Sequence, residues 1–241
     1  AGAAAPAIAD LDGDGLAEII VGGSVFSHDG VLRWSAPPGI DGCLQAGAYS
    51  IAADVAGDSD AEVIVGATAY DAAGAVVWRA MDGGVVVRDG MPAIADFDGD
   101  GLPEVVLVHG GSNGISILDG ATGARRCAGA APAASIGGGP PAIGDFDGDD
   151  RPEIGVVFQG VYVAFEGDCS VLWSRAVTDA SGQTSSCVFD FDGDGESEVV
   201  YTDEAEVHVF RGLDGTDRFT LPHRSATGLE NPVVAAGDGA R

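Results

Sequence analysis

A nine-residue pattern of carboxylates occurs at several places in the chain and could bind a metal ion. In the first copy, residues 10–18, the candidate ligands are four carboxylates and the main-chain carbonyl at position 7: Asp10, Asp12, Asp14, Leu16 and Glu18. Carboxylate and carbonyl oxygens that surround one point are what a hard cation of the size of calcium requires. The spacing therefore predicts a Ca²⁺ site in this loop.

Three further complete copies follow, and we number all copies in chain order: the third loop spans residues 96–104, the fourth 145–153 and the fifth 190–198. Their candidate ligands, with the position-7 carbonyl fourth in each set, are Asp96, Asp98, Asp100, Leu102 and Glu104; Asp145, Asp147, Asp149, Arg151 and Glu153; and Asp190, Asp192, Asp194, Glu196 and Glu198. In the fourth loop Asp150 replaces the turn glycine of position 6, and Asp tolerates the left-handed conformation. A single copy would be equally compatible with a solvated turn, but repetition in register favours metal binding.

The second loop, residues 54–62, is a degraded copy. Ala56 removes the carboxylate of position 3, and Ser59 replaces the glycine of position 6. The acidic residues that remain are Asp54, Asp58, Asp60 and Glu62. We expect this loop to bind metal weakly or not at all.

The loops differ from other cation sites of similar sequence. An EF-hand needs a Glu at position 12, where the first loop has Val21, and it needs flanking helices where this sequence has strand-like segments. Magnesium tolerates a wide, flexible cage of protein ligands poorly. Calcium is therefore the expected cofactor.

The loops mark an internal repeat of about 45 residues. A short apolar segment such as 7–9 precedes each loop, and a β-branched run such as 18–21 follows it. Two more strands follow, joined by a tight turn such as Asp29-Gly30. Four short antiparallel strands per repeat are typical of a β-propeller blade, whereas helical solenoids need a 3.6-residue period that these repeats lack.

We predict an all-β fold, a single β-propeller repeat array over residues 1–241, with five four-stranded blades and the beginning of a sixth. The predicted blades are residues 1–47, 48–89, 90–138, 139–183 and 184–229, and residues 230–241 would be the first strand of a further blade. A closed ring of five blades would leave that strand unpaired. We therefore expect part of a seven-bladed array, completed by a longer chain or by another subunit.

The order of apolar strand, Asp-x-Asp-Gly-Asp-Gly-x-x-Glu loop and a strand that ends in Val21-Gly22-Gly23 resembles the FG-GAP/VCBS repeats of integrin α-like β-propellers. This resemblance implies a secreted or cell-surface protein in which Ca²⁺ stabilises the inter-strand loops. It also implies an adhesion or protein-interaction module that binds its ligand at a propeller face. A lectin on the same scaffold is the alternative, and an enzyme similar to the calcium-bearing polysaccharide lyases is the third hypothesis.

Charge and motif content exclude several other classes of protein. The chain of 241 residues has 11 Lys+Arg against 38 Asp+Glu, a formal net charge of −27, and it has no basic cluster that could bind nucleic acid. Its longest apolar stretches are far shorter than the roughly 18 residues of a membrane helix, so we expect no membrane insertion. The sequence has no nucleophile elbow, and its histidines lie at unrelated repeat positions. We therefore expect no enzyme and no transition-metal site.

Four cysteines, Cys43, Cys127, Cys169 and Cys187, allow three pairings. We favour Cys127 with Cys169, because the first ends the outer strand of the third repeat and the second occupies the turn-glycine position of the fourth. Buried free thiols are the alternative. A disulfide, like calcium loops of modest affinity, is typical of proteins outside the cytosol.

One position, four residues after the turn glycine, keeps a bulky or sulfur-containing side chain in every repeat. We call it the slot, and its occupants are Trp34, Trp78, Cys127, Trp173 and Phe219. Exposed Trp rings could stack on sugars, but recurrence at one place in a blade favours packing between neighbouring blades. We predict the packing role.

Overall fold

The structure, a computed structural model, describes residues 6–37, 49–109, 114–130, 137–225 and 231–234. All regular secondary structure in these residues is β, and the strands form five four-stranded antiparallel sheets and one two-stranded hairpin. The predicted all-β class is confirmed. None of the described residues forms an apolar helix long enough to cross a bilayer.

Each four-stranded sheet is a meander in which the strands pair in chain order. The first sheet contains β1 (Pro6–Ala9), β2 (Glu18–Val21), β3 (Ser24–Phe26) and β4 (Leu32–Ser35), and the second contains β5 (Ser50–Ala53), β6 (Glu62–Val65), β7 (Thr68–Tyr70) and β8 (Val76–Arg79). The third contains β11 (Met91–Ala95), β12 (Glu104–His109), β13 (Gly114–Leu118) and β14 (Arg125–Ala130). The fourth contains β15 (Ala142–Gly144), β16 (Glu153–Phe158), β17 (Val161–Phe165) and β18 (Val171–Ala176), and the fifth contains β19 (Ser186–Phe189), β20 (Glu198–Thr202), β21 (Glu206–Phe210) and β22 (Asp217–Pro222).

The β-branched runs that follow the acidic loops form the second strand of each sheet. Every residue of β12 and of β16 is buried. Because alternate side chains of a strand point to opposite faces, complete burial means that both faces of these sheets are covered. The neighbouring sheets supply that cover.

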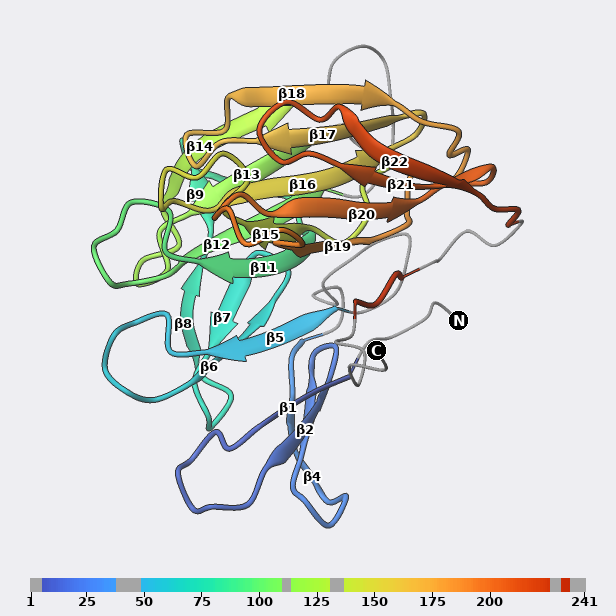
Figure 1. The fold of residues 1–241 in the computed structure, drawn as a ribbon. Coiled ribbons are helices and arrows are strands. Elements are labelled where there is room, and N and C mark those ends of the chain that lie inside the picture. The colour runs from blue at the N-terminus through green and yellow to red at the C-terminus, as the bar shows by residue number, and fades with distance from the viewer. Residues whose placement is uncertain (1–5, 38–48, 110–113, 131–136, 226–230, 235–241) are drawn as a thin grey trace.

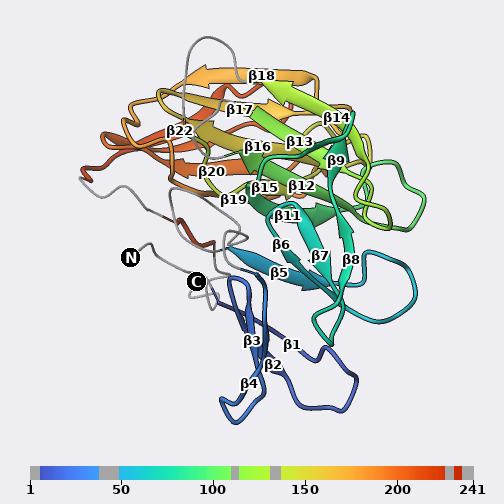
Figure 2. The same ribbon diagram turned by 180° about the vertical axis from the view of Figure 1, so that it is seen from behind.

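The sheets pack face to face in chain order around an arc, as Figures 1 and 2 show from opposite sides. The first strands follow one another, with contacts from β1 to β5, β5 to β11, β11 to β15 and β15 to β19. One apolar cluster fills each of the four interfaces between consecutive sheets. Among the described strands β19 has no comparable contact with β1, so the fold is propeller-like and these sheets do not close a ring by themselves.

The three slot tryptophans pack across the interfaces, as predicted, whereas Phe219 of the fifth sheet is 47% exposed. Trp78 is only 6% exposed, and its Nε1–H donates a hydrogen bond of 2.7 Å to the carbonyl of Gly120 in the next sheet. Its ring lies against the hairpin glycine Gly123, where a Cβ would come within 2.5 Å of the ring. Trp34 and Trp173 make the same contacts with the next sheet, at Gly74 and Gly215.

A disulfide replaces the Trp–Gly contact between the third and fourth sheets. Cys127 in the slot is bonded to Cys169, which occupies the hairpin-glycine position and keeps a left-handed φ of 67°. The predicted pairing is confirmed. Cys187 is a free thiol, and Cys43 lies outside the described residues.

Two features differ from the expected pattern of repeats. A short hairpin, β9 (Met81–Asp82) with β10 (Val85–Val86), lies between the second and third sheets. Residues 231–234, the described part of the predicted further strand, form no regular strand, and the Val234 backbone lies beside Cys187 of β19. The Ser185 hydroxyl donates a hydrogen bond to the Asn231 side chain there.

Candidate metal centres

Each acidic loop joins the first strand of its sheet to the second. The antiparallel register places the Glu of position 9 opposite the last residue of the first strand, as in Ala9 with Glu18 and Ala95 with Glu104. These strands therefore hold the two ends of every loop side by side. Local sequence and strand pairing act together to fold the loop back on itself.

The Glu of position 9 closes all five loops by accepting a hydrogen bond from the start of the loop. Its side chain is at most 5% exposed in every copy. One carboxylate oxygen, Oε2, accepts a hydrogen bond from the backbone N–H of position 2, over 2.6 to 3.0 Å: the donors are Leu11, Val55, Phe97, Phe146 and Phe191. Sequence reasoning assigned this Glu only as a metal ligand and missed its role in closing the loop.

The Asp of position 1 organises the turn. In the third loop its two oxygens accept hydrogen bonds from Gly99 N–H at 2.7 Å and Gly101 N–H at 2.8 Å. These glycines have φ of 75° and 88°, a conformation that costs other residues free energy. In the fourth loop Asp150 takes φ of 66° at position 6, which confirms the expected tolerance.

Three carboxylates converge in each complete loop, with ligand oxygens within 4.8 Å of one another, so each cluster could hold a metal ion. The clusters are Asp10, Asp12 and Glu18; Asp96, Asp98 and Glu104; Asp145, Asp147 and Glu153; and Asp190, Asp192 and Asp194. The described residues of the second loop form no such cluster, and its Ser59 has a left-handed φ of 77°.

The predicted carboxylate ligands of position 5 lie outside the clusters of the first, third and fourth loops. The carboxylates of position 5 accept hydrogen bonds from the N–H of position 7, from Leu16 to Asp14 and from Leu102 to Asp100 at 2.8 Å, and from Arg151 to Asp149 at 2.9 Å. In the fifth loop Glu196 donates its N–H to Asp194 at 2.9 Å, and the cluster includes that Asp in place of Glu198.

An arginine from the fourth strand pairs with the carboxylates of three loops. Arg33 bridges Asp12 at 2.7 Å and Glu18 at 2.9 Å in the first loop. Hydrogen bonding to this guanidinium holds the pKa of Asp12 below its usual range. The arginine therefore supplies positive charge between positions 3 and 9.

The third and fifth loops repeat this arrangement. Arg126 of β14 pairs with Asp98 and lies 2.9 Å from Glu104. Arg218 of β22 lies 2.8 Å from Asp192 and also pairs with Glu198. Sequence reasoning missed these residues, although the signal was present, because each arginine directly precedes the slot residue of its repeat.

The fourth loop has no such arginine, because the residue before its slot is Leu172. Glu153 is 1% exposed, and burial, together with the nearby acidic groups, raises its pKa to about 7. Glu166, beside the same loop, also has a raised pKa, from burial and from the charges of Asp147 and Asp149. This loop therefore gathers the largest uncompensated negative charge of the four complete copies.

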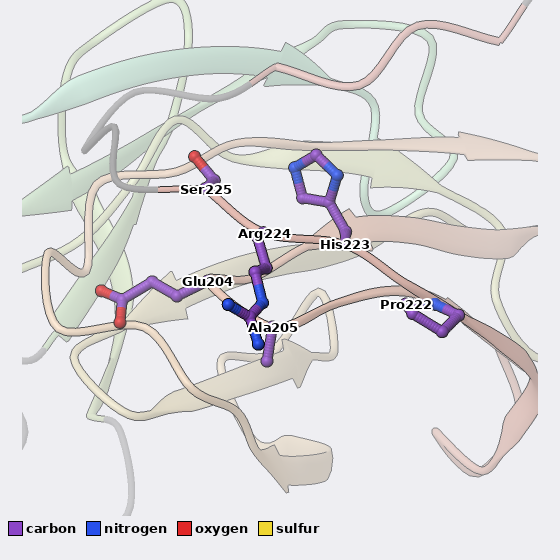
Figure 3. A pocket seen from close by; sticks show the side chains of 6 residues that line it. All are labelled: Glu204, Ala205, Pro222, His223, Arg224 and Ser225. Atoms are coloured by element: carbon purple, nitrogen blue, oxygen red, sulfur yellow. The ribbon is translucent and has the colours of Figure 1, made fainter.

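A separate hollow lies at the end of β22, lined by Glu204, Ala205, Pro222, His223, Arg224 and Ser225 (Figure 3). In this view the imidazole of His223 and the carboxylate of Glu204 point away from each other. The hollow contains no acidic cluster among the described residues. The four complete loops remain the candidate sites.

Comparison with known proteins supports the fold. Residues 96–156, which include the third and fourth loops, match the FG-GAP-like repeat family. The chain thus contains FG-GAP-like repeat sequence, which confirms the resemblance inferred from the loops. No curated protein sequence matches the chain.

Solved structures of low sequence identity share the fold. The biofilm matrix protein Bap1 of V. cholerae superimposes with a TM-score of 0.75 at 15% identity, over 98% of this chain and 64% of that one. BBS1N, solved in complex with ARL6DN, gives 0.57 at 14% identity, over 92% and 69% of the two chains. The quinohemoprotein alcohol dehydrogenase of Comamonas testosteroni gives 0.55 at 16% identity, over 95% and 46%. The chain is therefore a propeller-like protein with FG-GAP-like repeat sequence, and it spans less than two thirds of the Bap1 structure.

Proposed function

We propose that this chain is an extracellular calcium-binding β-propeller that acts as an adhesion or protein-interaction module. The observation that carries the proposal is the convergence of three carboxylates within 4.8 Å in each complete loop. Two carboxylates about 4 Å apart repel by up to about 4 kcal/mol at an effective dielectric of 20. A bound Ca²⁺ removes this repulsion and lets the loop support the neighbouring blades.

The Ca²⁺ ligands in this proposal are the carboxylates of positions 1, 3, 5 and 9 with the carbonyl of position 7. The role is structural, so Ca²⁺ should raise the melting temperature of the native chain. A thermal melt in calcium and in excess EDTA tests this directly. An identical melt in the two buffers would refute calcium binding.

Extracellular location is supported by the disulfide Cys127–Cys169, since such bonds persist in oxidising compartments. It is also supported by the fold shared with Bap1, a biofilm matrix protein. The proposed partner is a protein bound at a propeller face. Trp78 and Trp173 are buried between sheets, which weakens the lectin alternative, and a glycan array with and without EDTA tests it.

The proposal assigns no catalysis to the chain. Within the described ranges carboxylates of the acidic clusters accept hydrogen bonds from loop N–H groups or pair with arginines. Neither nucleic acid nor a membrane interior is a proposed partner, because the net charge is −27.

We further propose that the array continues beyond five blades, as in a seven-bladed ring. Phe219, the slot residue of the fifth sheet, is 47% exposed, and Phe189 on the same face is 49% exposed. At the other end of the arc, a Cβ on the hairpin glycine Gly30 would meet no atom within 4 Å, whereas Gly123 lies under a Trp ring. Each end thus presents one half of the contact that joins the other sheets.

A cysteine pair tests direct closure of the five sheets. Phe219→Cys with Gly30→Cys reproduces the positions of the native Cys127–Cys169 bond, and Cys169 shows that the hairpin position accepts cysteine. We expect no intramolecular cross-link between the new cysteines by mass spectrometry of the oxidised monomer. A cross-link formed in high yield would refute the open arc.

A further inference from the structure

We infer that Arg33, Arg126 and Arg218 are built-in counter-ions that lower the calcium affinity of the first, third and fifth loops, so that the fourth loop is the tightest site. The inference rests on the proposed function, because it assigns an order of affinity to the proposed calcium loops. The evidence for it is the pattern of ion pairs rather than the acidic clusters themselves.

The three arginines occupy one structural position. Each lies on the fourth strand of its sheet, one residue before the slot, and each pairs with the carboxylates of positions 3 and 9. Arg126 also reaches Asp119 at 3.1 Å. Their side chains are about one-third exposed or less, so water screens these pairs only partly.

Arg126 has a different effect in the empty loop and in the calcium-bound loop. Glu104 is 1% exposed, and a buried carboxylate without a counter-ion is costly. Arg126 supplies that counter-ion when calcium is absent. When calcium binds to Asp96 and Asp98, the same guanidinium lies close to the ion and repels it.

The fourth loop contains the same acidic positions without the arginine. Leu172 stands where the other complete loops have arginine, and Glu153 has no ion pair within 4.0 Å among the described residues. Arg151 lies at this loop beside Asp98 and Asp149, but it forms no ion pair of that length with the described carboxylates. A divalent cation at this loop therefore meets no arginine that is already paired with the carboxylates of positions 3 and 9.

Neighbouring acidic side chains increase this difference. Glu166 lines the same hollow as Asp149 and Glu153. Glu196 of the fifth loop approaches from the next sheet, where a Cβ on Gly148 would lie 3.3 Å from its Cγ. The fourth loop thus attracts a cation more strongly than the three loops that carry an arginine.

Two charge exchanges test the assignment by isothermal titration calorimetry with CaCl₂. Arg126→Met removes the counter-ion of the third loop and keeps the length of the side chain, and Leu172→Arg introduces one at the fourth. The native chain should show one tight site. We expect two tight sites in R126M, with the third loop tightened about ten-fold, and none in L172R. Arg125→Met is the matched control, because Arg125 lies on the same strand and pairs with Asp82 outside the loops, and it should leave the titration unchanged.

A melt in EDTA supplies a second readout that is independent of calcium. R126M should melt at a lower temperature than the native chain in EDTA and regain the difference in calcium, whereas R125M should not show this pattern. Circular dichroism in calcium confirms that each variant is folded. If L172R fails to fold, R126M alone tests the counter-ion role.

The outcomes separate the inference from the proposed function. If the native chain binds no calcium, both are overturned. If it binds calcium but R126M leaves the affinity of the third loop unchanged or weakens it, only the counter-ion role is overturned. A weakened affinity would show that the arginine positions the ligands instead. A native titration with equal affinity at all loops would overturn it as well.

Discussion

The packing of slot residues between sheets predicts a large loss of stability when Trp78 is truncated. In Trp78→Ala an almost fully buried indole disappears, and large aromatic side chains removed from a core cost about 3–5 kcal/mol. The hydrogen bond from Nε1 to the Gly120 carbonyl is lost as well, which adds about 1 kcal/mol. The expected total of about 4–6 kcal/mol is a large part of the 5–15 kcal/mol that stabilises an ordinary domain.

Urea unfolding followed by tryptophan fluorescence and circular dichroism measures this loss. Phe219→Ala is the matched control, because it removes the slot residue of the fifth sheet, which is 47% exposed and which no other sheet of the described residues covers. We expect it to cost about 1–2 kcal/mol, the effect of partial burial alone. Equal losses in the two variants would refute the reasoning, since they would mean that both slots are covered to the same extent.

A pair of glycine substitutions separates the contact itself from backbone strain. Gly123 and Gly30 are both hairpin glycines with positive φ, 68° and 85°, so alanine at either position is strained by a similar amount. Only at Gly123 would the new Cβ collide with an indole ring, that of Trp78. Gly123→Ala should therefore destabilise the chain more than Gly30→Ala, and the reverse order would contradict the packing that we describe.

Three further measurements test other parts of the structure. The rise in melting temperature on adding calcium should fall more in Asp98→Ala than in Asp58→Ala, because only the third loop is complete, and equal decreases would contradict the ranking of the loops. Burial lowers the pKa of His109 below its usual 6.5, so the fold favours the neutral imidazole. The resulting stabilisation is complete above about pH 6.5 and is lost as pH falls through the folded-state pKa. His109→Gln should therefore flatten the dependence of the urea midpoint on pH in that range. Reduction of Cys127–Cys169, which closes a loop with a sequence separation of 42, should cost up to about 4 kcal/mol, and a thermal melt unchanged by dithiothreitol would show that the bond contributes nothing.

The sequence by itself determined the local features of this protein. The nine-residue loops, the strands on either side and the hairpin glycines are each encoded within a few residues, so spacing and turn chemistry were enough to predict them. The Cys127–Cys169 bond could also be inferred, because both residues occupy repeat positions that meet at every interface. Because these local patterns repeat along the chain, together they predict the fold class.

Only the tertiary structure determined which charged side chains pair and which apolar side chains are buried. Arg126 lies 28 residues from Asp98 along the chain, and their ion pair exists because the sheet brings the fourth strand to the loop. The same holds for exposure: Trp78 and Phe219 occupy equivalent sequence positions, yet the third sheet buries Trp78, whereas no described sheet covers Phe219. Charge compensation and burial depend on which surfaces of the protein meet. The long-range packing of whole sheets determines which surfaces meet, and the spacing of residues within one loop does not determine it.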